Sequence, residues 1–241
     1  MKKFFVLLLA CLLFLSAAGC GKAFYVLSYP EQSTEFFDEK VPSQKTYEIG
    51  GKTLDLTYKY SKKYGIFQTD CYFANVDKRY HFDENGNITF IRDNDLFPVI
   101  ENIENLSEEQ IKDAVISRLS GIFDFSVYDT FTFHENISYY LNWEVSDKAV
   151  SFAVTVDQTG KIHYISITDR CSDEEPLKID GKTRDRLLKS AIQKEVKEDF
   201  TFKILSEKQT LDARGRNAVS YVVSVTDKKG FSLGVYAYTM A

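Results

Sequence analysis

The sequence predicts an α+β protein in which an antiparallel β-meander is followed by two helix-plus-antiparallel-sheet repeats. Apolar residues alternate with polar ones over many short segments, which is the period of a half-buried strand. Two later segments instead place apolar residues three and four positions apart, which is the spacing of one helix face. Alternating strands follow each helical segment, so we expect two copies of one unit.

Residues 47–98 form the predicted N-terminal β-meander. The alternating positions of the expected strands are Leu54, Leu56, Tyr58 and Tyr60, then Phe67, Thr69, Cys71 and Phe73. No helical spacing occurs in this stretch, so we expect strands only.

Residues 99–172 form the first predicted repeat. Ser107 with Gln110 makes a capping box, and Leu106 with Ile111 a hydrophobic staple, so a helix begins here. Its expected apolar face consists of Ile111, Ala114, Val115, Leu119 and Ile122. Alternating strands are expected at 131–133, 139–145 and 152–156.

Residues 173–241 form the second predicted repeat, entered through the acidic residues 173–175 and Pro176. Its helix presents Leu187, Leu188, Ala191, Ile192 and Val196. Strands are expected at 200–204, 219–225 and 231–235, with Phe231, Leu233 and Val235 on the buried face of the last.

Three turns share the pattern Asp-x-x-Gly, with an apolar residue one or two positions after the glycine. They lie at 83–86, 157–160 and 227–230, with offsets of 74 and 70 residues. Aspartate can hydrogen-bond the turn backbone, and glycine can take the positive φ of a type I turn with a bulge. The spacing indicates repetition at the scale of a small domain.

This order of a helix and then a meander, with its Asp-x-x-Gly hairpins, resembles the PepSY and cystatin-like group of small secreted α+β modules. The resemblance covers about 135 residues, 106–240. It implies non-catalytic binding or inhibition of another envelope protein, and it carries over no functional residue.

The first nineteen residues have the pattern of an export signal. Lys2 and Lys3 precede an apolar run, 4–18, and small residues stand immediately before Cys20. This resembles a bacterial lipoprotein signal peptide, 1–19, with its lipobox. The resemblance implies a diacylglyceryl group on Cys20, with acyl chains such as palmitate, and a protein anchored on the extracytoplasmic side of the cell membrane.

Three alternatives stay open for this segment. The run could be a transmembrane helix, although it falls short of the roughly 20 apolar residues that a span requires. Ordinary secretory cleavage after Ala18 would release a soluble protein. Cys11 could serve as the lipidated residue, although only a short apolar core precedes it.

Residues 20–46 are predicted to be a lipidated tether, because they hold Pro30, Pro42 and several polar residues. Removing Lys2 and Lys3 from the 30 basic residues leaves 28 against 35 acidic ones, a net charge of −7. An acidic surface disfavours nucleic acid and does not help docking to anionic lipid. Membrane attachment is therefore expected through the acyl chains alone.

Cys71 and Cys171 are the two cysteines left beside Cys20 after cleavage. The expected compartment permits a disulfide between them, which would be worth on the order of 4 kcal/mol in the chain-entropy model. Two unrelated thiols are the alternative, and the sequence favours it because nothing places their Cα atoms close together.

Motifs of known chemistries fail when their context is considered. Gly230-x-Ser232-x-Gly234 matches a nucleophile elbow, but a strand pattern follows it and no histidine does. Residues 83–94 begin like a calcium loop but lack the required glycine and glutamate. His81, His134 and His163 are too scattered for a metal site, so no metal or cofactor is expected.

Two functions of different class remain. The first is a lipid-anchored, non-catalytic binding or inhibitory module that presents sheet faces and strand edges to a protein, peptide or glycan partner in the cell envelope. The alternative is a secreted hydrolase whose carboxylates, such as Asp129, Glu135 and Glu144, meet only in the fold. The sequence favours the first.

Overall fold

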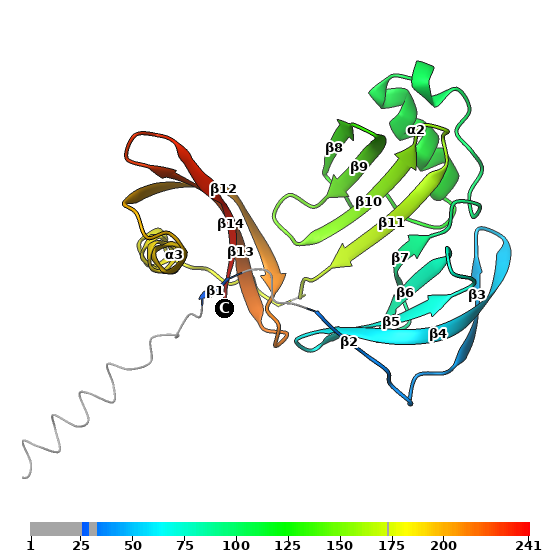
Figure 1. The fold of residues 1–241 in the computed structure, drawn as a ribbon, viewed down its shortest axis with the longest axis horizontal. Coiled ribbons are helices and arrows are strands. Elements are labelled where there is room, and N and C mark those ends of the chain that lie inside the picture. The colour runs from blue at the N-terminus through cyan, green and yellow to red at the C-terminus, as the bar shows by residue number, and fades with distance from the viewer. Residues whose placement is uncertain (1–25, 29–32, 173) are drawn as a thin grey trace, which may run out of the picture.

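The computed structural model describes residues 26–28, 33–172 and 174–241. The predicted signal peptide and Cys20 lie outside the described residues. Figure 1 shows two β-sheets, each with one α-helix packed on it.

The larger sheet has ten strands and is antiparallel throughout, in the order β2-β4-β5-β6-β7-β11-β10-β9-β8, with β3 also paired to β4. Its strands are β2 Thr34–Phe36, β3 Gln44–Ile49, β4 Lys52–Tyr64, β5 Phe67–Phe73, β6 Arg79–Asp83, β7 Ile88–Arg92, β8 Thr130–Glu135, β9 Ser138–Glu144, β10 Val150–Asp157 and β11 Ile162–Asp169. A short 3-10 helix, η1 Ile103–Asn105, precedes helix α2 Glu108–Leu119. Ile111, Val115 and Leu119 of α2 pack with one face of this sheet in a single core.

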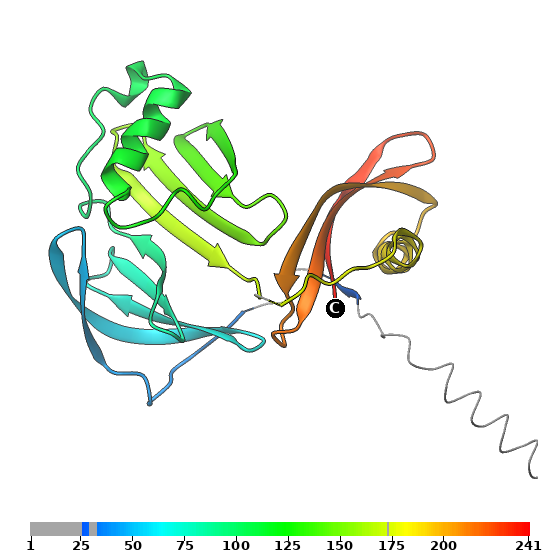
Figure 2. The same ribbon diagram turned by 180° about the vertical axis from the view of Figure 1, so that it is seen from behind.

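The smaller sheet has four strands in the order β1-β14-β13-β12. They are β1 Val26–Ser28, β12 Phe200–Leu211, β13 Asn217–Asp227 and β14 Ser232–Met240. Helix α3 Gly181–Glu195 covers one face through Leu188, Ala191 and Ile192. Figures 1 and 2 agree that the four-stranded sheet lies between α3 and the ten-stranded sheet.

The predicted fold class is wrong. Strands occupy 49% of the residues and helices only 14%, so the protein is mostly β. The meander and the strands after α2 are not separate units, because β7 pairs with β11 and joins them into one sheet. This pairing covers sheet edges that two independent repeats would leave open. The α+β arrangement of a meander and two helix-plus-sheet repeats is therefore replaced by one large and one small antiparallel sheet.

Parts of the predicted tether, 20–46, belong to the sheets. β1 pairs with β14, with Val26 opposite Met240. β2 and β3 both pair with β4. Within the described residues, no helix is long and apolar enough to cross a membrane.

The three predicted Asp-x-x-Gly turns are confirmed. In each, the aspartate carboxylate accepts backbone N–H bonds from residues two and four positions later, at 2.8–3.0 Å. Gly86, Gly160 and Gly230 have φ of 82°, 82° and 89°. The capping box of Ser107 and Gln110 is also present. The sequence patterns therefore predicted both the hydrogen bonds of these turns and those of the helix cap.

A fourth turn with the same aspartate hydrogen bonds, Asp212 to Gly215, lies outside the predicted pattern because polar residues follow its glycine. Asp212 accepts from the backbone of Arg214 and Arg216, and its side chain is buried. This turn contacts the other sheet, where the N–H of Ile66 donates to the carbonyl of Ala213 at 2.7 Å. It joins the β12–β13 and β4–β5 hairpins.

The predicted buried face of the last strand is wrong. Phe231 and Val235 are 69% and 62% exposed, and only Leu233 packs against the core. The register between β13 and β14 shifts at Val225/Thr226. A bulge of this kind reverses which residues face inward, so Tyr238 and Met240 are buried instead.

Candidate functional site

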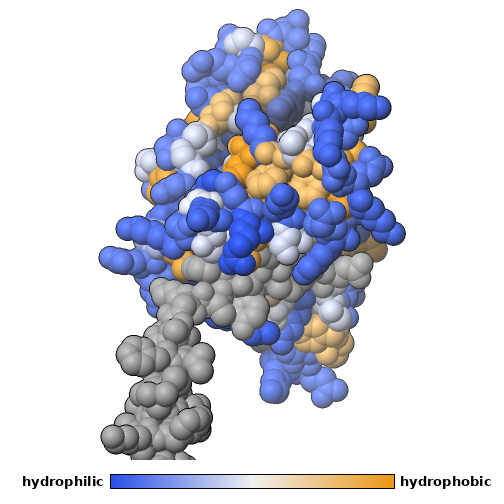
Figure 3. Space-filling model, turned by 90° about the vertical axis from the view of Figure 1, so that its left-hand side faces the viewer, coloured by the Kyte–Doolittle hydropathy of each residue, from blue (hydrophilic) through white to orange (hydrophobic). Residues whose placement is uncertain are grey.

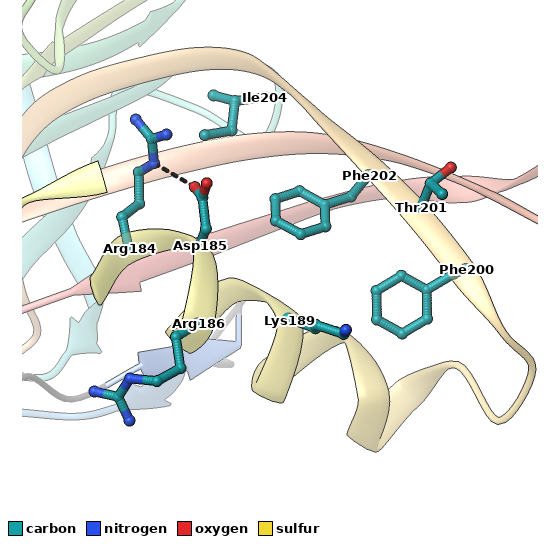
Figure 4. Close-up of a pocket in the computed structure, with 8 residues that line it drawn as sticks. All are labelled: Arg184, Asp185, Arg186, Lys189, Phe200, Thr201, Phe202 and Ile204. Atoms are coloured by element: carbon teal, nitrogen blue, oxygen red, sulfur yellow. Dashed lines mark hydrogen bonds and ion pairs between the residues drawn. The ribbon is translucent and has the colours of Figure 1, made fainter. Parts of the chain in front are cut away.

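The strongest candidate site is a groove between α3 and β12, with a volume of about 710 Å³. Figure 4 shows its residues: Arg184, Asp185, Arg186 and Lys189 from the helix, and Phe200, Thr201, Phe202 and Ile204 from the strand. We call it the α3–β12 groove.

The floor of the α3–β12 groove is apolar. Phe200, Phe202 and Ile204 alternate along β12, are half-buried, and pack against the core beneath α3. In Figure 4 the rings of Phe200 and Phe202 point to the side on which α3 lies. Alternation places these three side chains on one face of the strand, which is why the sequence builds a continuous apolar strip here.

The rim of the groove is cationic. Arg184 Nε donates to Asp185 Oδ1 at 2.9 Å, and Arg184 Nη1 lies 3.6 Å from Glu207. No ion pair of Arg186 or Lys189 is found among the described residues, and both side chains are exposed. Arg186 points away from the rings in Figure 4, whereas Lys189 lies near Phe200 and is the cation that faces the groove there.

The strand that forms this groove is a sheet edge. Among the described residues β12 pairs with a strand, β13, on one side only. On its other side the only backbone hydrogen bonds in the described part of the chain are at Gln209, whose N–H donates to the carbonyl of Asp147 and whose carbonyl accepts from the N–H of Ala149. The segment from Phe200 to Glu207 is therefore open on its outer side. Open edges offer backbone donors and acceptors to an added strand.

Hydrophobic side chains are visible from this side of the molecule. Figure 3 views the side on which α3 and the β13–β14 hairpin lie, and shows hydrophobic side chains gathered among hydrophilic ones. Leu205, Phe231 and Val235 are each more than half exposed on this small sheet.

The two predicted cysteines are free thiols in separate places. Cys71 is buried in β5, and Cys171 is half-buried after β11, where its thiol donates to the carbonyl of Gln209 at 3.3 Å. No disulfide joins them in the structure.

Folding brings Cys71 opposite His81, a pairing that the sequence did not predict. The two residues are cross-strand partners on β5 and β6. Burial raises the pKa of Cys71 to about 12, and burial with nearby Lys62 and Arg79 lowers the pKa of His81 to about 4. Both groups are therefore neutral near pH 7, whereas a nucleophilic cysteine needs its thiolate.

The other predicted polar residues do not converge. His134 stacks on Tyr140, and His163 Nε2 lies 2.9 Å from Asp157. Ser232 is exposed at the start of β14 with no helix after it. No group of three or more metal-ligating side chains occurs in the part of the chain that the structure describes.

The carboxylates of the hydrolase alternative are separated or engaged. Glu144 pairs with Thr130, and Glu135 with Tyr139, so the two glutamates stand near opposite ends of the β8–β9 pair. Five residues of strand separate them along β9, or roughly 16 Å, which exceeds the spacing that glycosidases use. Asp129 accepts from Ser146 at 2.7 Å, and Glu144 pairs with Lys208 at 2.8 Å.

The groove residues were not identified as a site from the sequence. Phe200, Phe202 and Ile204 were predicted only as a strand face. A usable signal is present in α3, where Arg186 has no acidic residue three or four positions away to pair with.

No protein-family model matches the chain, and no curated protein or solved structure shows significant similarity to it. The resemblance to lipoproteins and to PepSY and cystatin-like modules stays a prediction.

Proposed function

We propose that this protein is a lipid-anchored, extracytoplasmic binding module that holds an extended acidic segment of another envelope protein in the α3–β12 groove. The open edge of β12 beside an apolar floor is the single observation that carries the proposal. An extended segment can add to such an edge as a further strand, with the main chain giving affinity and alternate side chains giving specificity.

The rim defines the chemistry of the segment. Three cations line the groove against one carboxylate, and that carboxylate is already paired with Arg184. The chain as a whole has a net charge of −5, so this cationic rim runs against the overall balance. Complementarity therefore favours acidic residues alternating with apolar ones in the partner.

A peptide selection tests this function. The full chain, held in detergent micelles, is used to select from a displayed library of random dodecapeptides. We expect enrichment of sequences in which acidic and apolar residues alternate. No enrichment, or enrichment of basic sequences, would contradict the proposal.

Two charge reversals on α3 locate the binding. Lys189→Glu should weaken a selected peptide by about tenfold, because it places a like charge against the acidic segment. Lys182→Glu is the matched control: this lysine is exposed on the same helix, lies outside the groove, and stands at the N-terminus where a carboxylate is favourable. If both variants bind the peptide with equal affinity, the peptide does not bind in the α3–β12 groove.

The anchor has its own test at Cys20. One acyl chain holds a protein on a membrane only marginally, whereas two hold it stably. Cys20→Ser should therefore shift the protein from the membrane fraction to the soluble fraction or leave an unprocessed precursor. Unchanged membrane partition with a normal mature mass would exclude the lipid anchor.

A further inference from the structure

A second pocket lies on the ten-stranded sheet, on the face away from the core. Its volume is about 630 Å³, within the range of small-molecule sites, about 300–1,000 Å³. It forms where β7 and β11 diverge, because these strands pair at only two positions, Phe90 with Ser166 and Ile91 with Ile165. Beyond these pairs Thr89 and Thr168 line the pocket instead. We call it the sheet-face pocket.

Charges in the sheet-face pocket balance. Three cations and three carboxylates line it, namely Lys62, Lys63, Arg170, Asp83, Glu84 and Asp169. Lys62 is paired with Glu35 at 3.1 Å, and Asp83 is engaged by the backbone of its own turn. An ionic ligand would gain little here, so the pocket suits a neutral, polar one.

Neutral hydrogen-bonding groups are abundant in this pocket. The side chains of Asn85, Ser166 and Thr168 have no partner among the described residues, and Gln68 donates to Asp70 at 3.0 Å. Amide and hydroxyl groups both donate and accept hydrogen bonds. They match a ligand rich in hydroxyl groups, because each hydroxyl group also donates and accepts hydrogen bonds.

Aromatic rings stand beside these polar groups. Tyr64 and Phe67 stack with centroids 6.4 Å apart at 19°, with the Arg170 guanidinium 4.7 Å from the centre of Tyr64. Phe90 packs on His81 at 4.7 Å, and both line the pocket. Aromatic faces carry partial negative charge and attract weakly positive C–H groups, such as those on the flat face of a pyranose ring.

We propose that the sheet-face pocket binds an uncharged oligosaccharide. Sugar rings lie against Phe67 and Phe90, and Asn85, Ser166 and Thr168 bond their hydroxyl groups. This site is separate from the α3–β12 groove, since the two share no lining residue. The protein would thus hold a glycan and a protein segment on different sheets.

Calorimetric titration of the full chain in detergent micelles tests this site. The probes are the tetrasaccharides of glucose, in β-1,4 and α-1,4 linkage, and of N-acetylglucosamine. We expect at least one to bind and to be unaffected by an acidic peptide in the groove. Absence of binding by all three at millimolar concentration would overturn the proposal, whatever the outcome for the peptide.

Variants assign the bound sugar to the pocket. Phe90→Ala should weaken binding by about tenfold or more, because it removes one stacking ring. Asn85→Ala, at an exposed turn position, should weaken it severalfold without affecting the fold. Tyr140→Ala is the matched control: this aromatic residue is 40% exposed on β9 and lies outside the pocket. Equal affinities for Asn85→Ala and Tyr140→Ala would overturn the proposal.

Discussion

The Asp157–Gly160 turn of the large sheet and the Asp227–Gly230 turn of the small sheet share a sequence pattern and a backbone conformation. Their surroundings differ. A Cβ on Gly160 would lie 1.9 Å from the carbonyl oxygen of Ile100, whereas a Cβ on Gly230 would meet nothing within 4 Å. One turn is packed against the chain and the other is open. The same local signal thus serves packing in one sheet and only chain reversal in the other.

Gly160→Val should produce the largest loss of stability. It adds the strain of a β-branched residue at positive φ, about 1–3 kcal/mol, to a backbone collision with Ile100 of about 1–3 kcal/mol. We expect unfolding in denaturant to show a loss of about 2–6 kcal/mol, the sum of these two contributions. A midpoint equal to that of the parent would show that this turn is not packed as described.

Gly230→Val should cost less, because only the strain term applies. We expect a loss of about 1–3 kcal/mol in the same denaturant experiment. The difference between the two variants measures the packing contribution of Ile100. If both variants lose the same amount, tertiary contact at Gly160 contributes nothing.

Acid should remove the stability that the Asp157 carboxylate contributes to its turn. Burial raises the pKa of Asp157, but hydrogen bonds from Thr159, Lys161 and His163 outweigh it and hold this pKa below its usual value. A carboxyl with a lowered pKa stabilises the folded state above its unfolded pKa, about 3.9, and this contribution disappears as pH falls through the folded value. Unfolding followed from pH 6 to pH 2 should show a weaker acid dependence in Asp157→Asn than in the parent. Parallel curves would exclude this contribution.

Ser232→Ala should have the smallest effect. The side chain is exposed beyond the open turn, so the change should stay within about 0.5 kcal/mol. Leu233→Ala, at the neighbouring half-buried position, should cost more by leaving a cavity. If a fluorophosphonate labels Ser232 in the folded protein but not in the unfolded protein, Ser232 is a reactive nucleophile and not an ordinary exposed strand residue.

Short-range features were predictable from the sequence because neighbouring residues decide them. A capping box at Ser107 and positive φ at Gly160 follow from residues within four positions. The pairing of Ile91 with Ile165 joins segments far apart in the chain, and no local pattern selects that partner. Predicting the meander and the first repeat as separate units, instead of one ten-stranded sheet, was therefore an error of strand pairing that the helical spacing could not correct.

The candidate sites were less predictable than the turns. Phe200 and Phe202 alternate like any buried strand face, and only the order of the sheet shows that β12 is an edge. The reversal of burial in β14 depends on a bulge opposite Val225 and Thr226, which the alternation of Phe231, Leu233 and Val235 conceals. Edge position and register are properties of the assembled sheet, so a single strand does not encode them.

The pairing of β1 with β14 has a kinetic consequence. Val26 lies opposite Met240, so β1, the first described strand, has no partner until β14, the last strand, has formed. Closing so long a loop is entropically costly, and contacts of this kind slow folding. During synthesis the early strand must remain unpaired while the rest of the chain emerges. The small sheet should therefore be the last part of the molecule to become complete, because β1 can pair only after β14 has formed.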